Sequence, residues 1–109
     1  MAEGTNTRAR IAVLASGSGS NAEAILAHFS EGAGAEVGEV VWVATNRREA
    51  GVRERARRFG VEESHVPKTD MASGALLEEL RARRVGWVVL AGFLLKVPSD
   101  VCASFEGRM

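Results

Sequence analysis

The fold is decided by residues 11–21, which read IAVLASGSGSN. The first five form a continuous apolar run, which is typical of a strand buried on both faces. The next six hold two glycines and four small polar residues. Apolar residues then recur at helical spacing, at Ala22, Ile25, Leu26 and Phe29. The stretch therefore predicts a strand joined to a helix by a tight, glycine-rich loop.

The rest of the chain repeats this alternation of short apolar runs and longer amphipathic runs. Further strands are expected at residues 40–44, 64–66 and 87–90, and further helices at 49–59, 75–84 and 98–105. Residues 31–38 are expected to form a loop, and residues 1–9 a flexible leader. Strands that alternate with helices predict a Rossmann-like α/β fold, a parallel sheet flanked by helices, over residues 10–109. Ligands of such sheets bind at the carboxyl ends of the strands.

Composition limits the function classes. Of 109 residues, 46% are apolar and 26% charged, which is typical of a globular domain and excludes a disordered or fibrous chain. Fourteen basic and fourteen acidic residues cancel, which counts against nucleic-acid binding. The apolar runs are far shorter than the roughly 20 residues of a membrane span. The single cysteine, Cys102, cannot form an internal disulfide, which fits a reducing, cytoplasmic location.

The glycine-rich loop predicts a phosphate or nucleotide site. Glycines let the backbone approach a ligand closely, and the free N–H groups of a helix N-terminus attract anions. Ser18, Ser20 and Asn21 add side-chain donors. We therefore expect Gly19→Val to abolish binding, because its side chain would occupy the phosphate's approach. The simpler alternative is a strand-to-helix turn with Ser20 as N-cap.

A dinucleotide site is a second interpretation of the loop. Gly17, Gly19 and Ala22 fit the pattern G-x-G-x-x-A, although this match alone is weak. No acid follows the second strand, which counts against NAD, whereas Arg47 and Arg48 keep an NADP site open. A Walker A loop is excluded, since no Gly-Lys-Ser/Thr follows.

Four segments together resemble a known family. They are IAVLASGSGSNAEAIL (11–26), ATNRREAGVRERARRFGV (44–61), VVLAGFLLKVP (88–98) and FEGRM (105–109). They are similar to the folate-dependent phosphoribosylglycinamide formyltransferases, and the resemblance spans residues 11–109. It implies about four strands in the order 3-2-1-4, as in the N-terminal half of that fold. It also implies transfer of a formyl group from 10-formyltetrahydrofolate to glycinamide ribonucleotide, in de novo purine biosynthesis.

The resemblance also implies roles for single residues. Gly19, Ser20 and Asn21 match the cradle for the 5′-phosphate of glycinamide ribonucleotide. Leu94, Leu95, Lys96 and Val97 match the segment whose main chain lines the folate pocket. Two positions depart from the family pattern. Gly74 stands where an arginine often contacts the folate, and Lys96 replaces a commonly apolar residue.

The family's catalytic motif, N-x-H-P-S, and its later catalytic aspartate are absent from the 109 residues. The chain is therefore expected to resemble a truncated N-terminal half, with no catalytic residue of its own and no activity alone. An apolar edge strand at 87–90 and uncovered residues such as Phe105 predict self-association or a complementing C-terminal half. Two alternatives stay open: a non-catalytic phosphate- or NADP-binding module, and another folate-dependent formyltransferase, such as one acting on methionyl-tRNA.

Other conspicuous residues are expected to be structural. His28 should be solvated, and His65, at a strand end, is a minor candidate for the site. Neither histidine has partners at metal-ligand spacing, so no metal site is expected. The six arginines at positions 47–58 are interleaved with Glu49 and Glu54 and predict a solvated helix face. Trp42 and Trp87 are expected in the core or covering the sheet.

Overall fold

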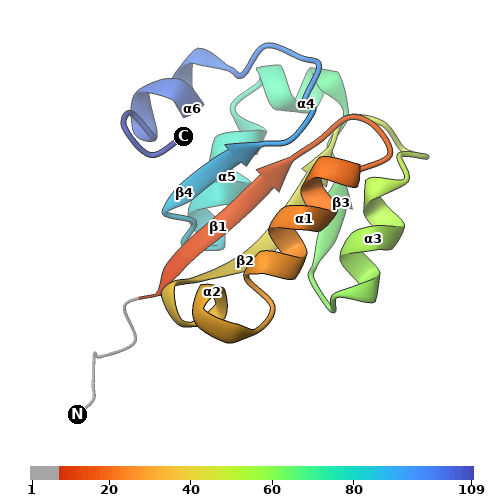
Figure 1. Cartoon of the computed structure of the whole chain (residues 1–109). Coiled ribbons are helices and arrows are strands. Elements are labelled where there is room, and N and C mark those ends of the chain that lie inside the picture. Colours follow the sequence, from red (N-terminus) through yellow and green to blue (C-terminus); the bar gives the residue numbers. More distant parts are fainter. Residues whose placement is uncertain (1–7) are drawn as a thin grey trace.

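A computed structural model describes residues 8–109, so the expected leader lies outside the described residues except at its end, where the first strand begins at Ala9. The chain forms β1 (Ala9–Leu14), α1 (Ser20–His28), α2 (Gly32–Val37), β2 (Gly38–Thr45), α3 (Val52–Arg58), β3 (Glu63–His65), α4 (Lys68–Ala72), α5 (Ala75–Ala82), β4 (Trp87–Leu90) and α6 (Ser99–Ser104). The four strands are parallel in the order β3-β2-β1-β4, which confirms the predicted sheet (Figure 1). The central strand β1 carries the glycine-rich loop at its carboxyl end.

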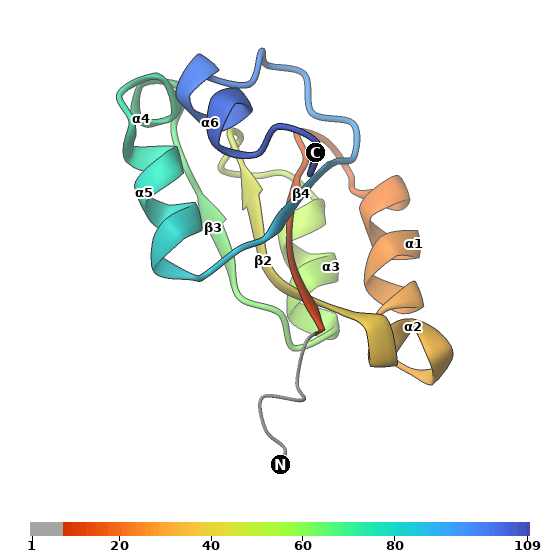
Figure 2. The same cartoon turned by 90° about the vertical axis from the view of Figure 1, so that its left-hand side faces the viewer.

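Helices cover both faces of the sheet. Figure 2 shows α4, α5 and α6 on one side and α1 and α3 on the other. The strand side chains alternate between two cores: Leu14 and Trp42 face α5 and α6, whereas Val13 and Val43 face α1 and α3. This alternation is the period of a strand buried on both faces, as the sequence pattern predicts.

Two short helices were not predicted. Residues 31–38, expected as a loop, contain α2 instead, because Gly34 packs directly on the end of α1. A Cβ at Gly34 would lie 2.0 Å from the carbonyl oxygen of His28, so glycine permits this contact. The helix α4 follows Pro67 and is held by its buried residue Met71, whose N–H donates to the Pro67 carbonyl at 3.0 Å. Both helices depend on tertiary packing that a five- or six-residue pattern does not reveal.

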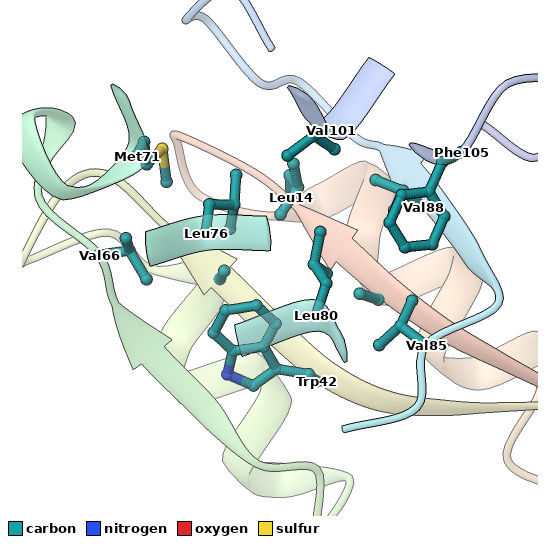
Figure 3. Packing of buried hydrophobic residues seen from close by; sticks show 12 residues of the cluster. Leu14, Trp42, Val66, Met71, Leu76, Leu80, Val85, Val88, Val101 and Phe105 are labelled. Carbon is teal, nitrogen blue, oxygen red and sulfur yellow. The ribbon is translucent and has the colours of Figure 1, made fainter. Parts of the chain in front are cut away.

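The edge strand β4 differs from the expected buried strand. Its Val88 is buried, but Trp87 and Leu90 are each 45% exposed because no further strand lies outside them in the described residues. The expectation of a covered Trp87 is therefore wrong, whereas Trp42 is fully buried as predicted. Phe105 was expected to be uncovered and is only 4% exposed, since it packs beside Val88 (Figure 3).

Across residues 8–109, no helix combines the length and the apolar character that a membrane crossing requires. The same residues contain no group of three histidine, cysteine or acidic side chains placed to hold a metal ion.

Candidate functional site

The N-terminus of α1 presents free backbone donors. Gly19 is the N-cap, with φ of 87°, and its carbonyl accepts the first helical hydrogen bond from Glu23 N–H at 2.7 Å. Ser20, which is the N-cap in the simpler alternative, is instead the first helical residue. Within the described residues, no backbone acceptor bonds the N–H groups of Ser20, Asn21 and Ala22. Together with the helix dipole, these donors form a cradle suited to an anion.

Packing against α3 fixes the requirement for glycine at position 19. A Cβ there would lie 2.6 Å from the Val52 Cβ. A side chain would therefore collide with α3. That it would also block the approach of phosphate stays a prediction. The positive φ adds a second cost for any residue but glycine.

Contacts from α3 hold the loop in place. Val52 N–H donates to the Gly17 carbonyl at 3.3 Å, and Arg55 Nε donates to the Ser18 carbonyl at 2.7 Å. Arg55 also forms an ion pair with Glu23 on α1. A cavity of about 400 Å³ lies beside the loop, lined by Ser16, Gly17, Ser18, Arg47, Glu49, Ala50 and Gly51. The cradle is thus rigidly positioned by a neighbouring helix.

The other arginines of α3, which were expected to form a solvated helix face, make ion pairs. Arg53 and Arg57 both pair with Glu63 on β3, at 2.5 and 3.1 Å, and Arg58 pairs with Glu54 at 3.2 Å. Burial alone would raise the pKa of Glu63, but hydrogen bonds and charge from Arg53 and Arg57 reverse this and hold the pKa below its ordinary value. These pairs anchor α3 on β3, beneath the loop that it contacts.

Ser16 joins the loop to the segment after β4. Its side chain is fully buried. Its hydroxyl donates to Asn46 Oδ1 at 2.6 Å and accepts the Leu94 N–H at 2.9 Å, while its own N–H donates to the Gly92 carbonyl at 3.2 Å. One small side chain therefore connects the carboxyl ends of β1, β2 and β4. Sequence reasoning missed Ser16 and Asn46, although a polar residue directly after an apolar strand is a usable signal.

The second half of the site is a cavity of about 790 Å³ near these strand ends. It lies between α4, the turn that follows it, and the segment from Leu94 to Asp100. All four predicted folate residues line it, and so does Gly74. Leu95 and Val97 pack against the core, whereas Leu94 is 75% exposed.

The backbone of this segment is available to a ligand. Residues 94–97 belong to no helix or strand, and the N–H groups of Leu95, Lys96 and Val97 make no backbone hydrogen bond within residues 8–109. Residues 19–21 and residues 94–97 thus both lie at the carboxyl ends of the strands, with Ser16 between them. That they bind phosphate and folate stays a prediction.

The remaining candidates lie apart from this site. His65 lines a different cavity of about 260 Å³, with Trp42, Asp70 and Arg83 among its neighbours. His28 is exposed on α1 and contacts the ring of Phe29 edge-on. Cys102 is an exposed free thiol on α6.

Comparison with known proteins gives a consistent result. The family described as Formyl transferase matches residues 9–109. The chain is 34% identical to the chloroplastic phosphoribosylglycinamide formyltransferase of Vigna unguiculata, over 96% of this chain and 35% of that protein. It superposes on glycinamide ribonucleotide transformylase 1 of Symbiobacterium toebii with a TM-score of 0.84 and 39% identity, covering 93% of this chain and 49% of that one.

A second solved structure, phosphoribosylglycinamide formyltransferase of Brucella melitensis, gives a TM-score of 0.84 at 28% identity, over 94% of this chain and 55% of that one. The chain thus spans about a third of the curated relative and about half of each solved structure.

Proposed function

Because this chain belongs to the formyl transferase family, we propose that it is the substrate-binding part of a phosphoribosylglycinamide formyltransferase. The reaction moves a formyl group from 10-formyltetrahydrofolate to the amine of glycinamide ribonucleotide in purine biosynthesis. The observation that carries the proposal is Ser16, whose buried hydroxyl connects the anion cradle to the backbone of Leu94. This contact holds a phosphate site and a second ligand site in one fixed relation.

The proposed division of labour follows from that geometry. The donors of Gly19, Ser20 and Asn21 bind the 5′-phosphate, and the main chain of residues 94–97 binds the folate. The substrate amine attacks the formyl carbon and loses a proton, while the bond from that carbon to the folate nitrogen breaks and the nitrogen takes up a proton. The amine itself is the nucleophile, so no covalent enzyme intermediate forms. Holding two reactants in a fixed orientation contributes up to about 7–11 kcal/mol of barrier lowering in favourable cases.

Proton transfer is not assigned to any described side chain. His28 is exposed on α1 and His65 lies in a separate cavity, so neither histidine adjoins the loop and the 94–97 segment. We propose that residues 1–109 bind both substrates and transfer the formyl group only at a rate close to background. General acid–base groups typically supply about 10²–10⁴-fold of rate.

Asn21→Asp tests the phosphate assignment. A carboxylate in the first turn of α1 stabilises the helix, so the variant should fold as well as the wild type. The same charge repels a phosphate dianion, and calorimetry should show at least about tenfold weaker binding of glycinamide ribonucleotide. Asn21→Ala removes a donor without adding charge and should weaken binding less. Equal binding by Asn21→Asp and wild type would remove the cradle from the site.

Two features of the surface support proposals about a binding partner and about the cellular location. We propose that the exposed side of β4, with Trp87 and Leu90, pairs with a second copy or with a complementing C-terminal half. Arg108 already approaches this edge, since its carbonyl accepts the Val88 N–H at 3.0 Å. Sedimentation over a hundredfold range of concentration tests self-association. The free thiol of Cys102 supports a cytoplasmic location.

A further inference from the structure

The only two lysines of the chain line the same cavity. All twelve other basic residues are arginines, and none of them lines it. Lys68 is the first residue of α4, whereas Lys96 lies in the segment after β4, 28 positions later. Both side chains are exposed at the cavity of about 790 Å³. Two separate parts of the fold thus bring a flexible ammonium group to one ligand site.

The cavity has an excess of positive charge. Among residues 8–109, Asp100 is the one carboxylate that lines it, and Asp100 Oδ1 accepts the Val101 N–H at 2.8 Å, at the start of α6. Neither lysine forms an ion pair with Asp100 or any other acid of residues 8–109. The two ammonium groups are therefore available to an anionic ligand.

The rest of the lining suits an elongated ligand with a flat head. Met71, Leu95 and Val97 supply apolar surface, and the free backbone groups of residues 95–97 supply donors and acceptors. The volume falls within the range of about 300–1,000 Å³ that small-molecule sites show. A folate combines a flat heteroaromatic head with a tail of one or more glutamates, which carries carboxylates.

We propose that Lys68 and Lys96 bind the carboxylates of the donor's glutamate tail, so that affinity rises with the number of glutamates. The inference rests on the proposed function and assigns two specificity-determining residues to it. A lysine suits this role because its stem is flexible and its charge is compact, so it follows a mobile carboxylate without a fixed bidentate geometry.

The test compares three ligands by calorimetry on the 109-residue chain: tetrahydropteroate, which has no glutamate, and tetrahydrofolate with one and with five glutamates. We expect affinity to increase along the series and the increase to diminish as salt rises. Lys68→Gln and Lys96→Gln should each reduce the advantage of the five-glutamate ligand by about two- to fivefold, as for exposed ion pairs. Binding of tetrahydropteroate should stay unchanged in Lys68→Gln, because Lys68 lies on α4, outside the 94–97 segment.

Matched controls separate charge from structure. Lys96→Arg keeps the charge and should keep the advantage of the long tail. Arg84→Gln removes one positive charge before β4, at the opposite end of the strands, and should leave all three affinities unchanged. A merely structural role for either lysine would weaken tetrahydropteroate as much as the glutamylated ligands.

Two results overturn the inference in distinguishable ways. If the wild type binds all three ligands equally, or if both Lys→Gln variants keep the full advantage of the tail, the lysines have no such role and the proposed function stands. If none of the three ligands binds, the folate site itself is wrong and the proposed function falls with the inference.

Discussion

The two halves of the site are built in opposite ways. The loop of residues 16–21 is held by contacts to its own backbone carbonyls, from Val52 N–H and Arg55 Nε. The segment of residues 94–97 is held mainly by its side chains, because Leu95 and Val97 pack into the core while their N–H groups stay free. The first half offers helix N–H groups to an anion, and the second offers an open main chain to a larger ligand.

This difference determines how each half responds to mutation. The loop depends on backbone conformation. Whether a substitution is tolerated at one of its residues therefore depends on the φ of that residue and on the space around its Cα. The 94–97 segment depends on apolar packing and on the hydrogen bond from Leu94 N–H to the Ser16 hydroxyl. We therefore expect the largest effects at a glycine of the loop, intermediate effects at the junction, and the smallest effects at the support beneath α3.

Gly19→Val should have the largest effect. The residue would have to keep a φ of 87° and place its Cβ 2.6 Å from the Val52 Cβ. Left-handed strain and overpacking each cost about 1–3 kcal/mol, so the free energy of unfolding should fall by about 2–4 kcal/mol in urea titrations followed by circular dichroism.

Gly17→Ala is the matched control for this substitution. Its φ is not in the left-handed region, and a Cβ there would meet nothing within 4 Å, so the change should stay within about 0.5 kcal/mol. If both variants are equally stable, the contact with Val52 does not explain the glycine at position 19.

The sequence predicted the loop better than its surroundings. Its apolar run, followed by glycines and small polar residues, predicted the strand, the turn and a following helix, although not that the helix begins at Ser20. The parallel order of the four strands was also confirmed. Local sequence patterns predict buried strands and amphipathic helices because the buried residues of each recur at a regular spacing along the chain. The resemblance added the 94–97 segment, whose apolar letters alone would have placed it in the core.

The errors have a common physical cause. Whether Trp87 is covered and whether Phe105 is buried depend on what packs against them from distant parts of the chain, and whether α2 forms depends on its packing against the end of α1. Ser16 is the clearest case, because its partners Asn46 and Leu94 lie 30 and 78 positions away. Periodicity carries no information about such contacts, so the junction between the two halves of the site emerged only from the structure.

Ser16→Ala tests this junction and should have an intermediate effect. It leaves Leu94 N–H and Asn46 Oδ1 without their partner, and an unsatisfied buried group costs about 1–3 kcal/mol. We expect the midpoint of urea unfolding to fall without a change in slope, and the amide resonances of residues 92–94 to shift.

Ser18→Ala is the control for the junction. Ser18 is exposed, and its hydroxyl makes no hydrogen bond within residues 8–109, so the substitution should change stability by less than about 0.5 kcal/mol. Unchanged resonances at residues 92–94 in Ser16→Ala would show that the two halves are positioned independently.

Glu63→Gln should have the smallest effect, and this effect should be confined to the half of the site formed by the loop of residues 16–21. The pKa of Glu63 is held below its ordinary value in the folded chain, so its contribution to stability is complete above about pH 5 and is lost as pH falls through the folded pKa. At pH 7 the variant should be less stable than wild type by about 1–2 kcal/mol, since it loses charged hydrogen bonds from Arg53 and Arg57. The difference should shrink as pH falls through the folded pKa of Glu63, because a protonated Glu63 resembles glutamine. Glu54→Gln, which removes a pair exposed on both sides, should differ little from wild type at pH 7 or below.

Because Glu63 anchors α3 and α3 holds the loop, amide shifts should extend to Gly17 and Ser18 and spare residues 94–97. Parallel stability curves for Glu63→Gln and wild type from pH 7 to pH 3 would contradict the role given to this carboxylate.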